Sequence, residues 1–294
     1  MLQLARLRPR HYIETPYGAD AALVGVTLVW GSTFIVVKDG LTGIGPFEFI
    51  ALRFGIACLA LALAFIGRLR ALDRAAWRAG LIIGCFLFLG YAFQTSGLLY
   101  TTASRAGFIT GLSVLIVPML ARAVLGQPVG RGVLVGIGFS TAGLWFLSAD
   151  GSFAFGFGDL LVLGCAVAFA AHIVSISAYA PRHDPIGLAI VQTGVVAVLA
   201  GAITLGVEGH PVVPVGSALS AATYTGLLGS AAVLGIQTSV QRYTSASHAA
   251  LIFSLEPVFA AIFAFIIAGE RLGPAGLLGG ALILAGMVAA ELWR

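Results

Sequence analysis

A glutamate followed by a proline deep in an apolar run is the pair of residues in this chain best suited to chemistry. Glu256 lies about ten residues into the run 246–269, where a charge is costly unless it is paired, hydrated or protonated. The carboxylate could bind the amine of a substrate or carry a coupled proton. It could equally be structural, held by hydroxyls and by backbone amides that a broken helix frees, and Pro257 favours such a break. Both interpretations stay open.

Two glutamines, Gln94 and Gln237, also lie inside apolar runs. Each amide can donate and accept hydrogen bonds, which suits a zwitterion or a polar metabolite. The alternative is hydrogen bonding between helices of a membrane bundle. Tyr91 precedes Gln94 by three residues, so the two share a helical face. We expect Tyr91, Gln94 and Gln237 to bind substrate.

The run 157–180 carries a polar stripe, His172, Ser175 and Tyr179, at helical spacings of three and four. A single histidine in a membrane helix is often a packed, hydrogen-bonded residue. Because of the stripe, we consider a cavity-lining role for His172 and Ser175 as well supported as a packing role.

Two further candidates have balanced alternatives. Trp30, with Thr33 and Phe34 on its face, would form an aromatic wall for substrate or would pack in the core. Arg53 enters the membrane by roughly 10 Å at 1.5 Å per residue. It could attract a carboxylate, but we favour its reaching the outer headgroups or pairing with Glu48.

Composition dictates the elements that position these residues. Of 294 residues, 59% are hydrophobic and only 10% are charged, and the mean hydropathy is +1.02. So few charges cannot cover the surface of a water-soluble domain, whereas about 20 apolar residues span a bilayer core of about 30 Å. We therefore predict an all-α integral membrane protein with ten transmembrane helices. Its apolar runs fall near 19–38, 46–67, 76–99, 104–125, 129–147, 157–180, 185–206, 217–241, 246–269 and 273–292.

Basic residues set the predicted orientation. With a cytoplasmic N-terminus, twelve of the sixteen Lys and Arg fall in inner segments, three in outer segments and one, Arg53, within a span. Both termini are therefore expected in the cytoplasm. Residues 1–18 are expected to form a short arm.

The two halves of the chain repeat each other. The segment 94–106 and the segment 237–249 share eight of 13 residues at an offset of 143, and earlier positions match at an offset of 139. We expect one repeat over 19–150 and a second over 151–294. Because five helices per repeat is an odd number, the second repeat enters the membrane from the opposite side. Inverted repeats are typical of secondary transporters with a midplane site.

Several motifs together carry a resemblance to a known family. They are Trp30-Gly31-Ser32, Ser254-Leu255-Glu256-Pro257-Val258, Gly269-Glu270-Arg271-Leu272 and the glycine-rich stretch 279–286. With them the chain resembles the EamA family of the drug/metabolite transporter superfamily, in which exporters of aromatic and neutral amino acids are found. The resemblance implies a ten-helix bundle with a central cavity lined mainly by its first, third, fourth, sixth, eighth and ninth helices.

The first half departs from the pattern of the second. Ser113 and Val114 occupy the positions that match Glu256-Pro257, and the nearest proline, Pro118, is displaced by four residues. We expect Pro118 and Pro257 to mark helix breaks or gates, with imperfect symmetry between the halves.

The functional prediction is a bacterial inner-membrane secondary transporter that exports small metabolites, above all amino acids, by alternating access. An exporter of lipophilic cations and a membrane-embedded enzyme are the alternatives. No motif indicates a cofactor, a metal site, catalytic residues or a nucleic-acid partner. The expected partners are a small-molecule substrate and the lipid bilayer.

Smaller features are expected to be structural. The three cysteines (Cys58, Cys85 and Cys165) are expected to be buried, and Asp20 and Asp159 to cap helices. Small residues at spacing four (Gly132, Gly136 and Ser140, with Gly276 and Gly280) permit close helix packing. That packing would lie within one chain or join two, which leaves a monomer and a homodimer open.

Overall fold

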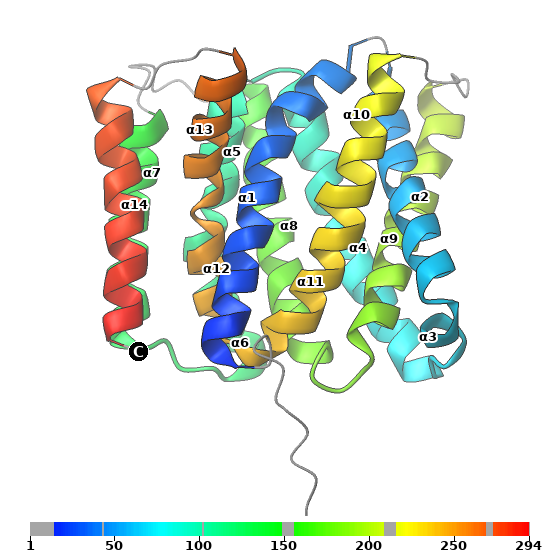
Figure 1. The fold of residues 1–294 in the computed structure, drawn as a ribbon, viewed down its shortest axis with the longest axis horizontal. Helices are drawn as coiled ribbons and strands as arrows, with labels where there is room; N and C mark the ends of the chain where they lie inside the picture. Colours follow the sequence, from blue (N-terminus) through cyan, green and yellow to red (C-terminus); the bar gives the residue numbers. More distant parts are fainter. Residues whose placement is uncertain are drawn as a thin grey trace, which may run out of the picture.

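The computed structural model describes residues 15–42, 44–101, 103–148, 156–208, 216–268 and 273–293, and this part of the chain is all-helical (Figure 1). The helices of the first half are α1 (Pro16–Gly40), α2 (Pro46–Ala64), α3 (Ile66–Arg70), α4 (Arg74–Leu98), α5 (Ala103–Gly111), α6 (Ser113–Leu125) and α7 (Arg131–Ser148). Those of the second half are α8 (Phe157–Tyr179), α9 (Pro185–Ile203), η2 (Thr204–Glu208), α10 (Ser217–Gly226), η3 (Leu227–Ala232), α11 (Val233–Val240), η4 (Gln241–Tyr243), α12 (Ala246–Phe253), α13 (Glu256–Ala268) and α14 (Pro274–Leu292).

Seven helical stretches of the described chain are long and apolar enough to cross a membrane. Three further apolar stretches are shorter, namely Ile109–Leu125, Arg131–Phe146 and Pro274–Ala290. The predicted class, an all-α protein that passes the membrane several times, is therefore confirmed. The predicted count of ten spans stays a prediction.

Prolines begin several of these helices. Pro16, Pro46, Pro185 and Pro274 each lie in a first turn, where the missing amide hydrogen costs no intrahelical bond. At α1 the Thr15 hydroxyl accepts a hydrogen bond from the Gly18 amide at 3.1 Å. Because α1 begins at Pro16, the expected arm over residues 1–18 is wrong for its last three residues. Residues 1–14 lie outside the described part.

The prediction that both aspartates cap helices is wrong for Asp20 and confirmed for Asp159. Thr15, not Asp20, caps α1, and Asp20 lies one turn further on, 3.2 Å from His248 Nε2 of α12. Asp159 does cap α8, from the third position of the helix, because its carboxylate accepts from the Gly156 amide at 3.0 Å. It also accepts from the Thr101 hydroxyl at 2.6 Å and so ties the start of α8 to the end of α4.

Two helix breaks lie at equivalent positions of the halves. The chain turns at Leu112 between α5 and α6, and at Leu255 between α12 and α13, which is 143 residues later. The Leu112 amide donates to the Ile109 carbonyl at 3.1 Å, and the Leu255 amide donates to the Ile252 carbonyl at 3.0 Å. Each bond reaches back three residues instead of the four of a regular α-helix, so the backbone forms a tighter turn. Pro118 lies inside the unbroken helix α6, so its expected role as a break is wrong. Pro257 lies in the first turn of α13, directly after a break.

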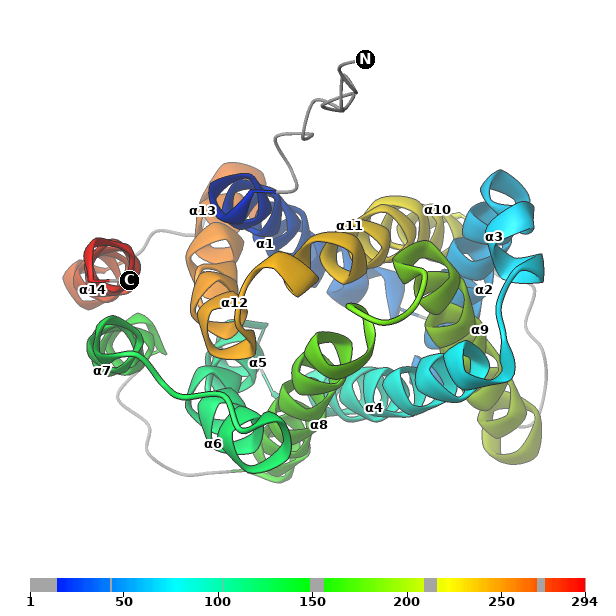
Figure 2. The same ribbon diagram turned by 90° about the horizontal axis from the view of Figure 1, so that it is seen from below.

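The helices form a ring around the centre of the molecule, with α7 and α14 as a separate pair at one edge (Figure 2). At the end where α1 begins, below in Figure 1, a core of small and branched side chains joins α1, α6, α8, α11 and α12. We call this end of the molecule the lower end. Gln241 of η4 adds two hydrogen bonds to α8 there, to the Ile173 carbonyl at 2.7 Å and the Ser177 hydroxyl at 2.8 Å. The ring is therefore tightly packed at its lower end.

The cysteines are free, but only Cys165 is fully buried. Cys58 is partly buried and Cys85 is exposed on α4, so the expectation of burial is wrong for Cys85.

Glycines let α7 and α14 approach to backbone contact. A Cβ atom added to Gly136 would lie 2.8 Å from the Gly286 carbonyl oxygen, and one added to Gly143 would lie 2.5 Å from that of Gly279. Gly132 likewise faces the Ala290 carbonyl at 3.0 Å. The predicted packing is thus confirmed for Gly132 and Gly136 of α7, which contact α14 within one chain. On α14 the contact is made by Gly279, Gly286 and Ala290, whereas a Cβ at the predicted Gly280 would meet Val258 of α13 at 3.8 Å.

Gly143→Val should force α7 and α14 apart and lower the free energy of unfolding by about 1–3 kcal/mol, because neither backbone can yield without moving its helix. Gly138→Val is the matched control, since a Cβ at Gly138 on the same helix meets nothing within 4 Å. Thermal unfolding in detergent measures both variants. Equal melting temperatures for the two would contradict the close packing.

Candidate functional site

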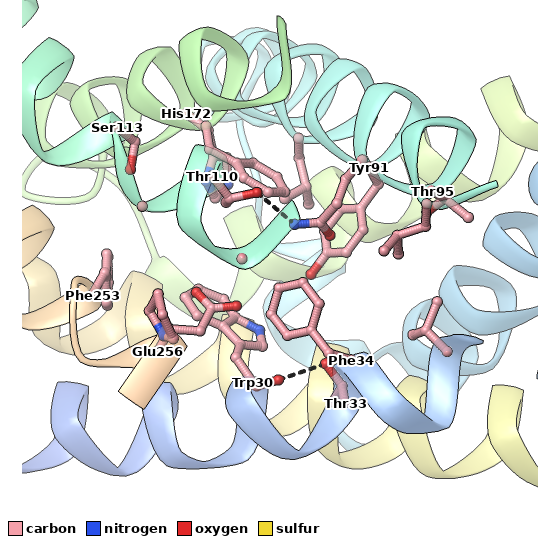
Figure 3. A pocket seen from close by; sticks show the side chains of 18 of the residues that line it. Trp30, Thr33, Phe34, Tyr91, Thr95, Thr110, Ser113, His172, Phe253 and Glu256 are labelled. Carbon is pink, nitrogen blue, oxygen red and sulfur yellow. Dashed lines mark hydrogen bonds between the residues drawn. The ribbon is translucent and has the colours of Figure 1, made fainter. Parts of the chain in front are cut away.

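The described helices enclose a cavity of about 810 Å³, its open mouth included. Its lining is mostly apolar with a few polar side chains, which is typical of a small-molecule site. Its wall comes from α1, α2, α4, α5, α6, α8, α11, α12 and α13, so residues distant in sequence face one space (Figure 3). The lining reaches Leu98 at the upper end of α4 and Val37 near that of α1. Toward the lower end it stops at Gln237 and at Ile173, which belongs to the packed core.

Most of the residues expected to bind substrate line this cavity. Trp30, Tyr91, Gln94, His172, Gln237 and Glu256 are among them, as are Thr33, Phe34 and Pro257. Ser175 and Pro118 are not, and both are buried within the bundle. Ser175 lies one turn below His172 on α8, where the packed core begins.

Glu256 owes its position to the break before α13. It is the first residue of that helix, where the unpaired backbone amides and the helix dipole favour a negative charge. Figure 3 shows its side chain beside Trp30, facing the cavity. No other residue in the described part of the chain is hydrogen-bonded to the carboxylate. Its oxygens are therefore available to a ligand.

Arg53 of α2 is the principal residue that the sequence analysis misjudged. Its side chain is 3% exposed and lines the cavity. Nε donates to the Ser230 hydroxyl at 2.8 Å, and Nη2 donates to the Tyr91 hydroxyl and the Gly229 carbonyl, both at 3.2 Å. The guanidinium carbon also lies 4.7 Å from the centre of the Tyr91 ring. The expected reach to the headgroups or to Glu48 is wrong, because these inward partners hold the charge in the bundle.

The partners of Arg53 come from a local widening of a helix. Residues Leu227–Ala232 form the π-helical turn η3 between α10 and α11, a feature frequent at functional sites. The Gly229 carbonyl in this turn accepts from Arg53 and also from the indole Nε1 of Trp30 at 3.1 Å. A Cβ at Gly229 would come within 2.8 Å of Thr33, so glycine permits this close approach. Periodicity in the sequence gives no sign of such a turn.

The two equivalent glutamines have different environments. Gln94 donates to Thr110 of α5 at 3.3 Å across the cavity wall (Figure 3). Gln237 is fully buried and donates to Gln241 at 3.1 Å, which in turn holds α8. The Gln237 oxygen has no hydrogen-bond partner in the described part of the chain. The lower wall of the cavity therefore presents an unsatisfied acceptor.

His172 lines the cavity while its ring nitrogen is engaged elsewhere. Nε2 lies 2.8 Å from Gln192 Oε1 of α9, and Gln192 donates to the Thr238 hydroxyl of α11 at 3.0 Å. All three side chains are buried. This network joins α8, α9 and α11, so its geometry fits the packed histidine that the sequence allowed.

Charge and aromatic surface define what the cavity can do. Arg53 and Glu256, one basic and one acidic residue, both line its wall. Trp30, Tyr91 and Phe169 supply apolar surface, together with Phe34 and Phe253. Among the described residues, no group of three or more His, Cys, Asp or Glu could hold a metal ion. The site suits a small molecule with polar and apolar parts.

A bundle of membrane helices around an internal cavity, lined by aromatic residues and a few charged and polar ones, is typical of membrane transport proteins. Residues 18–149 and 156–290 each match the EamA-like transporter family, so the chain belongs to that family. The resemblance seen in the sequence is thereby confirmed.

Similar proteins agree with this assignment. An uncharacterized transporter of Archaeoglobus fulgidus is 37% identical over 280 residues, which are 93% of this chain and 86% of that protein. A protein of Streptantibioticus cattleyicolor named a probable terminal-alkyne amino-acid exporter is 27% identical, over 91% of each chain. A solved crystal structure superposes with a TM-score of 0.78 at 20% identity and covers 94% of this chain and 97% of the other. That likeness shows the fold alone.

His172→Leu should lower the free energy of unfolding by about 1–2 kcal/mol, because it leaves the buried Gln192 oxygen without its partner. The double variant His172→Leu/Gln192→Leu removes both groups and should recover part of the loss. Thermal and denaturant unfolding measure these variants. If the stability lost in the double variant equals the sum of the losses in the two single variants, His172→Leu and Gln192→Leu, the two side chains are not coupled.

Proposed function

We propose that this chain is a secondary transporter that exports amino acids across a bacterial inner membrane by alternating access. The single observation that carries the proposal is the Glu256 carboxylate, which faces an aromatic-lined cavity inside the bundle and has no hydrogen-bond partner in the described part of the chain. An ionisable side chain inside a membrane protein that has no such partner points to a ligand, a proton or water as its counterpart. The ammonium group of an amino acid is such a ligand.

Ten membrane spans, arranged as inverted repeats over 19–150 and 151–294, are part of the proposal. Support comes from the matching breaks at Leu112 and Leu255 and from the two matches to the family. The three shorter apolar stretches would complete the ten. Two equivalent halves can exchange arrangements and so open a central site to either side.

The proposed orientation has both termini in the cytoplasm. The lower end then faces the cytoplasm, because the exposed arginines Arg68, Arg70, Arg74 and Arg182 lie there. A packed core lies at each end of the cavity: one at the lower end, and a second at the upper end, where Val37 of α1 and Leu98 of α4 are buried. The α7–α14 contact lies within the chain, so the glycines at this contact are compatible with a monomer.

An exporter of lipophilic cations is the second candidate. A free carboxylate beside aromatic faces would also attract an organic cation. A membrane-embedded enzyme is favoured by no observation of the site.

Glu256→Gln should abolish amino-acid flux or lower it by about tenfold or more, because the amide cannot neutralise an ammonium group. Asp39→Asn is the matched control, since Asp39 is exposed at the upper end of α1 and outside the cavity lining. Uptake of radiolabelled L-phenylalanine into proteoliposomes measures the flux. Flux of a lipophilic cation without amino-acid flux would favour the second candidate. Absence of any flux in the unaltered protein would overturn the proposal.

A further inference from the structure

Arg53 is held in a fixed orientation at the cavity wall. Its Nε and Nη2 hydrogens are taken up by Ser230, Tyr91 and Gly229, and its side chain is 3% exposed. Within the described part of the chain, Nη1 has no hydrogen-bond partner. Two hydrogens of a pre-oriented guanidinium are therefore left for another group.

The partners of Arg53 leave its charge without direct compensation. Two are hydroxyls and one is a backbone carbonyl, and all three are neutral. A buried guanidinium is expensive without an anion, and it favours a planar carboxylate that can accept two parallel bonds. Glu256, the one acidic residue of the cavity lining, lies on the same wall, and no ion pair joins it to Arg53 in the described part of the chain.

The cavity thus presents one positive and one negative group to its contents. A lipophilic cation would bind near Glu256 but would be repelled by Arg53. A simple anion would bind near Arg53 but would be repelled by Glu256. A molecule with both charges satisfies both groups and adds no net charge to the site. We infer that Arg53 binds the carboxylate of the cargo, so that the site selects zwitterionic α-amino acids over the corresponding amines. This inference rests on the proposed function and specifies its substrate class.

The aromatic wall indicates the side chain of that amino acid. The indole nitrogen of Trp30 already donates to Gly229, so the ring offers its apolar surface to a ligand. Phe169 packs edge-on against Tyr91, with ring centres 5.3 Å apart. An apolar or aromatic side chain fits these surfaces, which makes L-phenylalanine a suitable probe.

The test compares L-phenylalanine with L-phenylalaninamide, which keeps the ammonium group and the ring but lacks the carboxylate. Binding of both to purified protein is measured by competition with radiolabelled L-phenylalanine and by direct titration. Unaltered protein should prefer the acid by about tenfold or more. Arg53→Gln should remove this preference while amide affinity changes by less than about threefold, and Arg53→Lys should retain part of it. Arg242→Gln, an exposed arginine of η4 outside the cavity lining, should leave the preference intact.

Equal affinity of the unaltered protein for the two compounds would overturn the inference. An Arg53→Gln variant whose affinities for the acid and the amide fall by the same factor would also overturn it, because that result indicates a purely structural arginine. If Arg53→Gln does not fold, the comparison of acid and amide in the unaltered protein decides. Transport of L-phenylalanine without preference over the amide would leave the proposed function standing. Failure to bind or transport either compound would overturn both.

Discussion

The cost of placing a charge inside a membrane protein is the constraint on which this structure depends. Arg53 and Glu256 lie in predominantly apolar helices, and exposing either charge to lipid would be costly. The fold meets this cost by turning both toward one internal cavity. A π-helical turn brings the Gly229 carbonyl and Ser230 to the guanidinium, and a helix break places Glu256 at the amide end of α13. The irregular parts of the backbone are thus where the charges are.

The breaks at Leu112 and Leu255 show how a duplicated unit can diverge in chemistry while keeping its geometry. Both breaks have a backbone hydrogen bond that reaches back three residues instead of four, yet only the second is followed by a glutamate and a proline. Ser113 occupies the position that matches Glu256 and also lines the cavity. The break therefore does not require proline, and the ionisable group was gained or kept on one side only. A site with one carboxylate and one guanidinium is asymmetric even within a symmetric frame.

Several features were accessible from the sequence because they depend on composition or spacing. Apolar length predicts the membrane class, glycine spacing predicts the α7–α14 contact, and the matching segments place Gln94 and Gln237 in the same cavity. Other features depend on tertiary geometry and could not be predicted. The orientation of Arg53 follows from a π-helical turn that leaves no periodic signal, and Asp20 contacts His248, 228 residues away, instead of capping α1. The sequence predicted a helix break at Pro118 because it is a proline, but the break occurs six residues earlier, at Leu112.

A structure determined by electron cryo-microscopy in lipid nanodiscs with saturating L-phenylalanine would test the central claim most directly. The account predicts ligand density in the cavity, with the carboxylate at Arg53, the ammonium group at Glu256 and the ring against Trp30 and Tyr91. Ligand density in the opposite orientation, or at a site outside the cavity, would contradict it. So would an ion pair between Arg53 and Glu256 that excludes the ligand at saturation.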